Sequence, residues 1–538
     1  MNPKYILPVV IEFLRKHFLS LFLIVTVSIW SLWPILKDPT KRIAEKWDGV
    51  MIVWILNQTV QKIPNDLANI FNGNIFYPNK NTMAYSDMLI PSGFISYLPV
   101  KIFSQPNIAV GTTLLFGQIT SILICYFWFF EVTKNKTASL ITSLALGVSV
   151  IRLGFVVHLQ MWTMQWWLIS IYCFWKYFKS RRITTLLISA LFWGIQMWES
   201  PMGVYFALLA IILISFGNVK IILKEKVNFL LFLMTALLVM LLPARAYLAV
   251  SNEFDYVRSI RDAAHFSLGI DLLLKNLLTD GIFAGLMIMG LIINKKSKDG
   301  DFGWLKILLL VSLLLSLGPV LKIAGSTFKI FGKIFVPLPY GIFYYIIPGF
   351  SAFRSPGRWL MPALFAAGFI FCLKLTDLLK TTKVNIKNKI IFTLVVIMAL
   401  LPLSKKIPYF EFKKTADYPK VYQFINKLPG GVLLELPVYS WAHGEKAAVE
   451  TERMVYSLYH RKHLLGGASG FEPPSWNEVR NLYWQSFPSP EFDSLIKSKS
   501  VKYVLIWKDL VEEGRLEKIK KYYKHFEFED DKYLLFSL

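Results

Sequence analysis

Two acidic residues stand where a carboxylate could act as a base beside a membrane. Asp48 lies in a polar stretch after the first apolar run of the chain and precedes a second apolar segment, and Asp87 begins a third such segment, Asp87–Phe103. A positioned carboxylate can take the proton from an attacking hydroxyl group. Asp is also a favoured helix N-cap, and for either residue taken alone capping is the stronger interpretation.

Polar residues also mark the ends of two apolar runs. His158 and Gln160 follow one run, and Glu199 ends another. Polar groups at the edge of a bilayer core are costly unless they are used, so these three residues are candidates for substrate binding. A structural histidine or a helix-end glutamate with satisfied hydrogen bonds is the competing interpretation.

Several arginines lie at the same ends of the apolar runs. They are Arg245, Arg258, Arg261, Arg354 and Arg358. If these ends lie on the outer side of the membrane, their arginines oppose the usual bias of basic residues toward the cytoplasm. Its planar fork matches phosphate or pyrophosphate, which makes these residues candidates for binding a phosphorylated substrate. Contact with lipid phosphates explains each one singly about as well.

The composition decides which solvent these groups meet. Hydrophobic residues make up 55% of the 538 residues and charged residues 17%, whereas soluble proteins average about 25% charged residues. Such a chain requires lipid, and apolar runs of spanning length recur along its first three-quarters. The predicted spans are His17–Leu36, Asn107–Phe130, Ala138–Val156, Met161–Phe178, Ile183–Trp198, Met202–Phe216, Val227–Val250, Gly281–Ile293, Gly303–Leu321, Arg358–Leu379 and Ile390–Leu403.

The basic residues fix the predicted orientation. The chain has a net charge of +24, and its Lys and Arg residues are spread over short loops between apolar runs rather than along one stripe, so nucleic acid is not a predicted partner. The clusters that fall on one side are Arg15/Lys16, Lys134/Lys136, Lys179/Arg181/Arg182, Lys220/Lys224/Lys226, Lys295/Lys296/Lys298 and Lys380/Lys383/Lys387/Lys389. The positive-inside bias makes that side cytoplasmic, with the N-terminus. The first run is long enough to remain as a signal anchor.

Three cysteines fall within predicted spans: Cys125, Cys173 and Cys372. Neither a disulfide framework nor a cysteine metal site is therefore indicated.

The remaining segments form the predicted outer face. Residues 37–106 are one large outer loop, in which Val50–Ile63 and Asp87–Phe103 are helices along the membrane surface. Residues 1–404 form the transmembrane core, and residues 405–538 form a small extracytoplasmic α/β domain. Its predicted elements are a helix at Pro419–Lys427, a strand at Gly431–Val438, helices around Trp476–Tyr483 and Glu491–Lys497, a strand at Val501–Trp507, a helix at Leu510–Tyr523 and two short strands.

No P-loop, Rossmann fingerprint, zinc-spaced His/Glu pair or Gly-x-Ser-x-Gly elbow is present. Soluble nucleotide chemistry is therefore not indicated. A different set of motifs points to a family. They are Asp48-Gly49 with Trp54, Asn74–Pro78 leading to Tyr85-Ser86-Asp87, His158-Leu159-Gln160, Pro348–Arg358, Leu434–Pro437 and Gly466–Pro474.

With these motifs, the chain resembles the GT-C superfamily of multi-pass membrane glycosyltransferases, and within it a set of bacterial members. The resemblance covers nearly the whole chain. It departs from the expected pattern at two places, because Trp47-Asp48-Gly49 replaces Gly-Asp-Pro and Asp87 replaces Glu. The apolar runs predict about eleven transmembrane helices in the plasma membrane. The resemblance implies a many-span core with an outer C-terminal domain.

The resemblance also implies an activity and its partners. A polyprenyl-phosphate-linked sugar would donate its sugar to an acceptor hydroxyl on a glycan, lipid or protein at the outer face. Asp48 would act as base, with Asp87 as the second acid, and outer arginines would bind the phosphate. The resemblance leaves a divalent metal open, and the sequence shows no ligand cluster for one.

Two other functional classes stay open from the sequence. A multi-pass transporter or lipid flippase is favoured by the number of spans, but inverted repeats and ionisable groups near the midplane are not evident. A non-enzymatic protein of cell-envelope assembly would bind a partner through the C-terminal domain. In that case the outer-loop acids would be dispensable.

Overall fold

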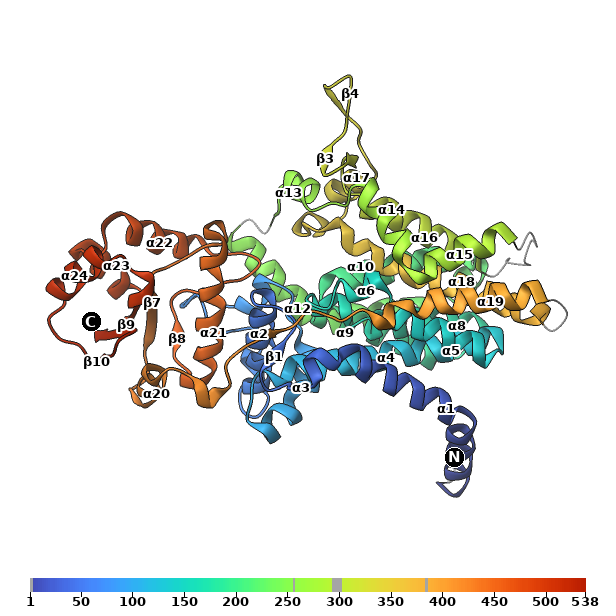
Figure 1. The fold of residues 1–538 in the computed structure, drawn as a ribbon, viewed down its shortest axis with the longest axis horizontal. Helices are drawn as coiled ribbons and strands as arrows, with labels where there is room; N and C mark the ends of the chain where they lie inside the picture. Colours follow the sequence, from blue (N-terminus) through green and yellow to red (C-terminus); the bar gives the residue numbers. More distant parts are fainter. Residues whose placement is uncertain (1–2, 255–256, 293–301, 383–385) are drawn as a thin grey trace.

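The computed structural model describes residues 3–254, 257–292, 302–382 and 386–538. Ile293, Lys295, Lys296, Lys298 and Lys383, which belong to a predicted span and to predicted basic clusters, lie outside the described residues. The molecule is elongated, with a helical bundle at one end of its long axis and the C-terminal domain at the other (Figure 1).

The bundle contains helices that could cross a membrane. In the described residues five are long and apolar enough, at Arg15–Leu36, Ile108–Thr133, Lys136–Leu153, Lys226–Glu253 and Pro356–Lys380. A sixth is counted if the pair α14 (Ile270–Thr279) and α15 (Gly281–Ile292), bent by 82°, forms one broken span. The prediction of a helical multi-pass membrane protein is confirmed, while the count of about eleven spans stays a prediction.

Shorter helices complete the bundle. They are α8 (Gln165–Ser180), α9 (Ile183–Glu199), α10 (Pro201–Phe216), α16 (Gly303–Ser316) and α19 (Ile386–Leu400). Together with α4 (Ile108–Thr133), α5 (Lys136–Gly147), α12 (Lys226–Glu253) and α18 (Leu360–Thr382) they bury a core rich in aromatic side chains. Trp128 on α4 is fully buried there and contacts Phe365 and Phe369 on α18.

The segment after α1 (Pro3–Leu36) folds against the C-terminal domain. It forms β1 (Arg42–Ile43), α2 (Asp48–Lys62) and α3 (Ile90–Phe103). The bounds of α2 and α3 are close to those predicted for the two helices of this loop. Helices α2 and α3 approach closely at Gly93, where a Cβ atom would lie 2.5 Å from Cβ of Thr59. In Figure 1, α2 lies between the bundle and α21 (Ala448–His460) of the C-terminal domain, and it buries most of its residues.

Strand β1 pairs with β6 (Phe410–Glu411), so that Arg42 lies opposite Glu411. The start of the loop after α1 and the start of the C-terminal tail therefore lie side by side. Both segments also contribute to one continuous hydrophobic core. The two segments predicted to lie on one face of the membrane thus form a single folded unit, and the predicted boundary at residue 404 stays a prediction.

The C-terminal domain contains a five-stranded mixed sheet in the order β10-β11-β9-β7-β8. Its strands are β7 (Val432–Leu436), β8 (His463–Leu464), β9 (Val501–Trp507), β10 (Phe528–Glu529) and β11 (Tyr533–Ser537). Strand β7 is parallel to β8 and β9, whereas β11 is antiparallel to β9 and β10. Around the sheet pack α20 (Lys420–Lys427), α21, α22 (Pro474–Ser486), α23 (Pro490–Ser498) and α24 (Glu513–Tyr522). The α/β prediction is confirmed.

Helix α21 was not among the predicted elements, because its sequence is polar. Its charges are buried in pairs: the Arg453 guanidinium lies 2.9 Å from the Glu450 carboxylate and 3.6 Å from that of Glu435 on β7. Arg453 also donates hydrogen bonds to the carbonyls of Glu435 and Pro437. Pairing and hydrogen bonding allow these charges to be buried in a helix that covers the sheet.

Candidate active site

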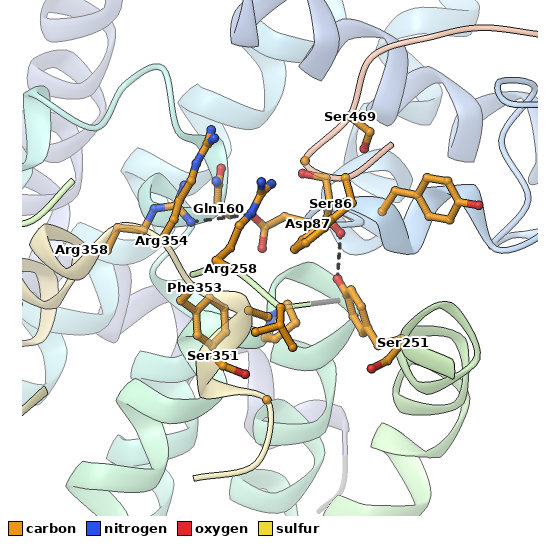
Figure 2. A pocket seen from close by; sticks show the side chains of 18 of the residues that line it. Ser86, Asp87, Gln160, Ser251, Arg258, Ser351, Phe353, Arg354, Arg358 and Ser469 are labelled. Atoms are coloured by element: carbon orange, nitrogen blue, oxygen red, sulfur yellow. Dashed lines mark hydrogen bonds and ion pairs between the residues drawn. The ribbon is translucent and has the colours of Figure 1, made fainter. Parts of the chain in front are cut away.

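A cavity of about 470 Å³ lies where the bundle, the loop after α1 and the C-terminal domain meet. Its lining includes Asp48 from α2, residues 85–87 before α3, His158 and Gln160. The wall also includes Tyr205, Arg258, Trp441, residues of α12, residues 348–349, 351–354 and 358, and residues 469–471. Residues far apart in the sequence are thus brought together around one space (Figure 2).

Asp48 occupies the first turn of α2 but does not cap it. The N-cap is Trp47, and no side chain caps the helix from that position. The Glu45 carboxylate instead accepts hydrogen bonds from the backbone N–H groups of Trp47, at 2.7 Å, and Gly49, at 3.5 Å. The capping interpretation of Asp48 is therefore wrong, because the preceding acid serves the helix end and leaves Asp48 to line the cavity.

The imidazole of His158 lies beside Asp48, with its Nδ1 3.7 Å from Oδ2 of the carboxylate. Burial lowers the pKa of His158 to about 3, and the positive charges of Arg358 and Arg354 contribute. The imidazole is therefore neutral near pH 7. It therefore lies beside the Asp48 carboxylate without neutralising its charge.

Burial raises the pKa of Asp48 above its usual range, and the negative charge of Glu45 adds to this effect. Arg354 and Arg358 act in the opposite direction. The side chain is still 37% exposed. Because that exposed part faces a cavity, the surrounding protein removes much of the water that would stabilise the carboxylate.

Asp87 lies before α3 but does not cap this helix either, since the N-cap is Leu89 and makes no side-chain capping bond. The Asp87 carboxylate accepts a 2.6 Å hydrogen bond from the Ser200 hydroxyl. Its other oxygen lies 3.9 Å from the guanidinium of Arg358. Asp87 therefore joins the start of α3 to the arginine side of the cavity.

Glu199 lies behind this acid rather than in the cavity wall of the described residues. It is fully buried. Its carboxylate accepts hydrogen bonds from the backbone N–H and hydroxyl of Ser92 and from the Thr163 hydroxyl. Its carbonyl accepts from the N–H of Leu89. Glu199 thus serves the unpaired donors at the start of α3, and its position supports Asp87 instead of a substrate contact.

Arg258, Arg354 and Arg358 point toward one side of the cavity (Figure 2). The Arg258 guanidinium lies 4.0 Å from the centre of the Phe471 ring, and its backbone N–H bonds to the Ser351 carbonyl. Burial and the neighbouring charge of Arg358 lower the pKa of Arg354. In the part of the chain that the structure describes, the buried Nε of Arg358 has no hydrogen-bond partner. Clustered cations with an unused donor suit an anionic ligand.

The other two candidate arginines lie elsewhere. Arg245 and Arg261 are exposed, and neither is among the described residues that line the cavity. On α12 the neighbours Ala244, Tyr247 and Leu248 line it instead. The helix turns its Arg245 side away from the site.

Sequence patterns did not single out several lining residues. The Tyr247 hydroxyl donates to the Ser86 carbonyl at 3.0 Å, and the Tyr205 hydroxyl donates to the Pro348 carbonyl at 2.6 Å. Both tyrosines stand in apolar runs with no spacing signal. Trp441 of the C-terminal domain stacks on Trp47 with ring centres 5.9 Å apart. Gly470, in contrast, belongs to the Gly466–Pro474 motif of the sequence, and it lies so close to the Tyr85 carbonyl that a Cβ atom would be 2.8 Å from it.

Metal ligands are not clustered in the described residues. No three His, Cys, Asp or Glu side chains among them come together in a way that could hold an ion.

Comparison with solved structures places this arrangement in a known fold. ArnT from Cupriavidus metallidurans, in a crystal structure with undecaprenyl phosphate bound, aligns with a TM-score of 0.53 and 9% identity, covering 97% of this chain and 98% of ArnT. The chain has the GT-C fold. The apo structure of the same enzyme aligns with a TM-score of 0.51 and 8% identity, covering the same shares of both chains.

A second GT-C protein gives the same result. The arabinofuranosyltransferase AftD from Mycobacteria, in a cryo-EM structure of its R1389S mutant, aligns with a TM-score of 0.55 and 11% identity over 92% of this chain. The chain spans only 36% of the length of AftD. No protein-family model and no curated protein sequence matches the chain.

Proposed function

We propose that this GT-C protein is a glycosyltransferase that moves a sugar from a polyprenyl-phosphate donor to an acceptor hydroxyl at the outer face of the plasma membrane. One observation carries the proposal: Asp48 and three arginines line the same cavity in a GT-C fold. A carboxylate base and a cationic site for a phosphate leaving group are the two elements that this transfer requires.

In the proposed reaction, the Asp48 carboxylate accepts the proton of the acceptor hydroxyl. The hydroxyl oxygen forms a bond to the anomeric carbon while the bond from that carbon to the phosphate oxygen breaks. The departing lipid phosphate takes the electron pair, and Arg258, Arg354 and Arg358 stabilise its charge. No general acid is needed, because the leaving phosphate departs as an anion.

His158 and Asp87 would act as positioning residues. The imidazole of His158 lies beside the Asp48 carboxylate, and because it is neutral it does not protonate that group. Asp87 holds the guanidinium of Arg358 toward the cavity, as the two side chains are 3.9 Å apart. Gln160, which also lines the cavity, supplies an amide for hydrogen bonds to the substrate.

The lipid tail of the donor would leave the cavity along α12. Leu248 on this helix lines the cavity, and further along Leu241, Leu238 and Leu237 are exposed on the bundle surface. A polyprenyl chain could follow these side chains into the bilayer, where its apolar surface is solvated by lipid. Trp441 offers an aromatic face near Asp48 for a sugar ring of the acceptor or donor.

The outer location rests on the distribution of basic residues. Lys136 donates to the carbonyl of Lys16, so the first two basic clusters lie together. Arg181, of the third cluster, pairs with Glu225, which lies between Lys224 and Lys226 of the fourth cluster. The positive-inside bias favours a cytoplasmic position for this end. Reporters fused after Leu538 test this orientation. Activity of a reporter that works only in the cytoplasm would place the cavity on the wrong face for this reaction.

The activity itself is tested with the purified full-length protein in lipid vesicles. Polyprenyl-phosphate sugars are supplied with candidate acceptors, and release of polyprenyl phosphate is followed. Release that requires an acceptor supports the transferase. Movement of an intact donor between leaflets without cleavage would identify a flippase instead.

A further inference from the structure

The segment between α16 and α18 carries two small hairpins besides the cavity arginines. Strand β2 (Lys322–Ile323) pairs with β3 (Ser326–Thr327), and β4 (Lys329–Ile330) pairs with β5 (Ile334–Phe335). In Figure 1 this segment projects sideways from the bundle, with β4 at its far end. The β4–β5 hairpin, residues 328–335, is thus held away from the rest of the described protein.

The end of this hairpin is apolar and exposed. Phe331 is 92% exposed, Ile334 61% and Phe335 52%. Phe331 also has a φ of +50°. In turns, a residue with positive φ is usually Gly, Asn or Asp. Three exposed apolar side chains gathered at one tip form a patch of the kind that contacts a membrane or a partner.

Lysines flank the apolar tip on both sides. Lys329 lies opposite Phe335 in the register, with its ammonium 4.9 Å from the ring centre, whereas Ile330 lies opposite Ile334. Lys333 is the last residue of the turn, before β5. Between Phe302 and Thr376 the sequence contains no acidic residue. The hairpin therefore combines an apolar tip with uncompensated positive charge, the pattern of a segment that enters an anionic membrane surface.

The position of the hairpin in the chain suits a place at the edge of the bilayer. It lies between the apolar helix α16, which ends at Ser316, and the candidate span that begins at Pro356. The same segment continues to Arg354 and Arg358 of the cavity. Helix α17 (Tyr340–Ile346), which follows the hairpin, exposes Tyr345 and Ile346.

We propose that the β4–β5 hairpin anchors the loop between α16 and α18 in the membrane leaflet on the side of the cavity. Ile330, Phe331 and Ile334 enter the upper acyl region, and Lys329 and Lys333 bind the phosphates of anionic phospholipids. The anchor fixes one end of the segment that carries Arg354 and Arg358, and it does not depend on the proposed reaction.

Site-directed fluorescence tests this insertion. The three native cysteines are buried, so a Phe331→Cys variant can be labelled selectively with a polarity-sensitive dye. The full-length protein is placed in nanodiscs of phosphatidylcholine with phosphatidylglycerol. We expect a blue-shifted emission that nitroxides on the acyl chains quench. The same dye on a Lys518→Cys variant, in the exposed part of α24, is the control and should show neither effect.

Two results would overturn the proposal. One is a dye at position 331 that is as solvent-exposed and as unquenched as the dye at position 518. The other is efficient formation of a disulfide bond between two unlabelled molecules of the Phe331→Cys variant, which would show that a second copy covers the tip.

The role of the lysines is measured on the labelled Phe331→Cys protein. Lys329→Gln and Lys333→Gln should each lower the ratio of inserted to exposed hairpin about five-fold in anionic nanodiscs. In nanodiscs of phosphatidylcholine alone they should have little effect. Lys497→Gln, an exposed lysine of the C-terminal domain, is the matched control. Equal insertion of all variants in the anionic lipid would refute binding of the lysines to phosphates.

Discussion

The guanidinium of Arg358 lies 3.9 Å from the carboxylate of Asp87, and Ser200 donates a hydrogen bond to the other oxygen of the same group. Both oxygens of Asp87 are therefore engaged. The imidazole of His158, which is neutral near pH 7, lies 3.7 Å from the carboxylate of Asp48. A carboxylate that must receive a proton is better placed at Asp48, and one that orients an arginine is better placed at Asp87.

Asp48→Asn should lower turnover by about 10²–10⁴-fold, because the amide cannot accept the proton of the acceptor. Asp87→Asn should lower turnover less than Asp48→Asn does, and it should weaken donor binding more, because the guanidinium of Arg358 loses its charged partner. Initial rates at saturating donor and acceptor measure both effects. Asp66→Asn is the matched control, because Asp66 belongs to the same loop but pairs with Lys62 away from the cavity. Wild-type turnover of Asp48→Asn would transfer the assignment of the base to Asp87.

Activity should fall on acidification at a higher pH than an ordinary aspartate would give. The base must be ionised, and burial together with Glu45 raises the pKa of Asp48, so protonation begins closer to neutrality. Glu45→Gln removes the negative charge but keeps an oxygen for the end of α2. We expect it to shift the acid limb of the rate profile to lower pH. An unchanged limb, with intact folding, would show that another group limits the rate in acid.

Much of the architecture could be predicted from the sequence because the membrane imposes it. Apolar runs gave a multi-pass helical protein, and β9 has the predicted bounds Val501–Trp507. Hydrophobic patterns are local, and so are the signals that end helices and strands. The polar helix α21 could not be found this way, because the burial of Glu450 and Arg453 depends on partners elsewhere in the fold.

The charged residues of the candidate site could be predicted from the sequence, but the residues that contact them could not. Asp48, Asp87 and the arginines of residues 348–358 stood out because charge near lipid is costly. Capping of α2 by Glu45 and of α3 by Glu199 involves contacts that the spacing does not reveal, since Glu199 reaches Ser92 from a distant helix. Trp441 lines the cavity only because the C-terminal domain folds back onto the loop after α1.

Donor binding should depend on the forked geometry of the arginines. Arg354→Lys and Arg358→Lys keep the charge but lose the planar arrangement of donors, and each should weaken binding about ten-fold or more. Binding of undecaprenyl phosphate to the protein in nanodiscs measures the change. Arg245→Lys is the control, because this exposed arginine on α12 lies outside the described lining. If both cavity variants bind like the wild type, the phosphate site lies elsewhere.

The stability of the whole site should depend on Glu199. Its buried carboxylate accepts hydrogen bonds from the N–H and hydroxyl of Ser92 and from the Thr163 hydroxyl. Glu199→Ala removes all of these acceptors at once, and each buried donor left unpaired costs about 1–3 kcal/mol. We expect the variant to be about 3–5 kcal/mol less stable. Glu199→Gln keeps one oxygen and should lose less.

Unfolding of the protein in detergent micelles, followed by thermal or chemical denaturation, measures these differences. Glu411→Ala is the surface control, since its exposed ion pair with Arg42 contributes about 1 kcal/mol or less. Activity adds a second readout: because Glu199 holds the start of α3, its loss should displace Asp87 and weaken donor binding. A Glu199→Ala variant that unfolds like the wild type and binds donor normally would show that water satisfies these donors and that α3 is held by other contacts.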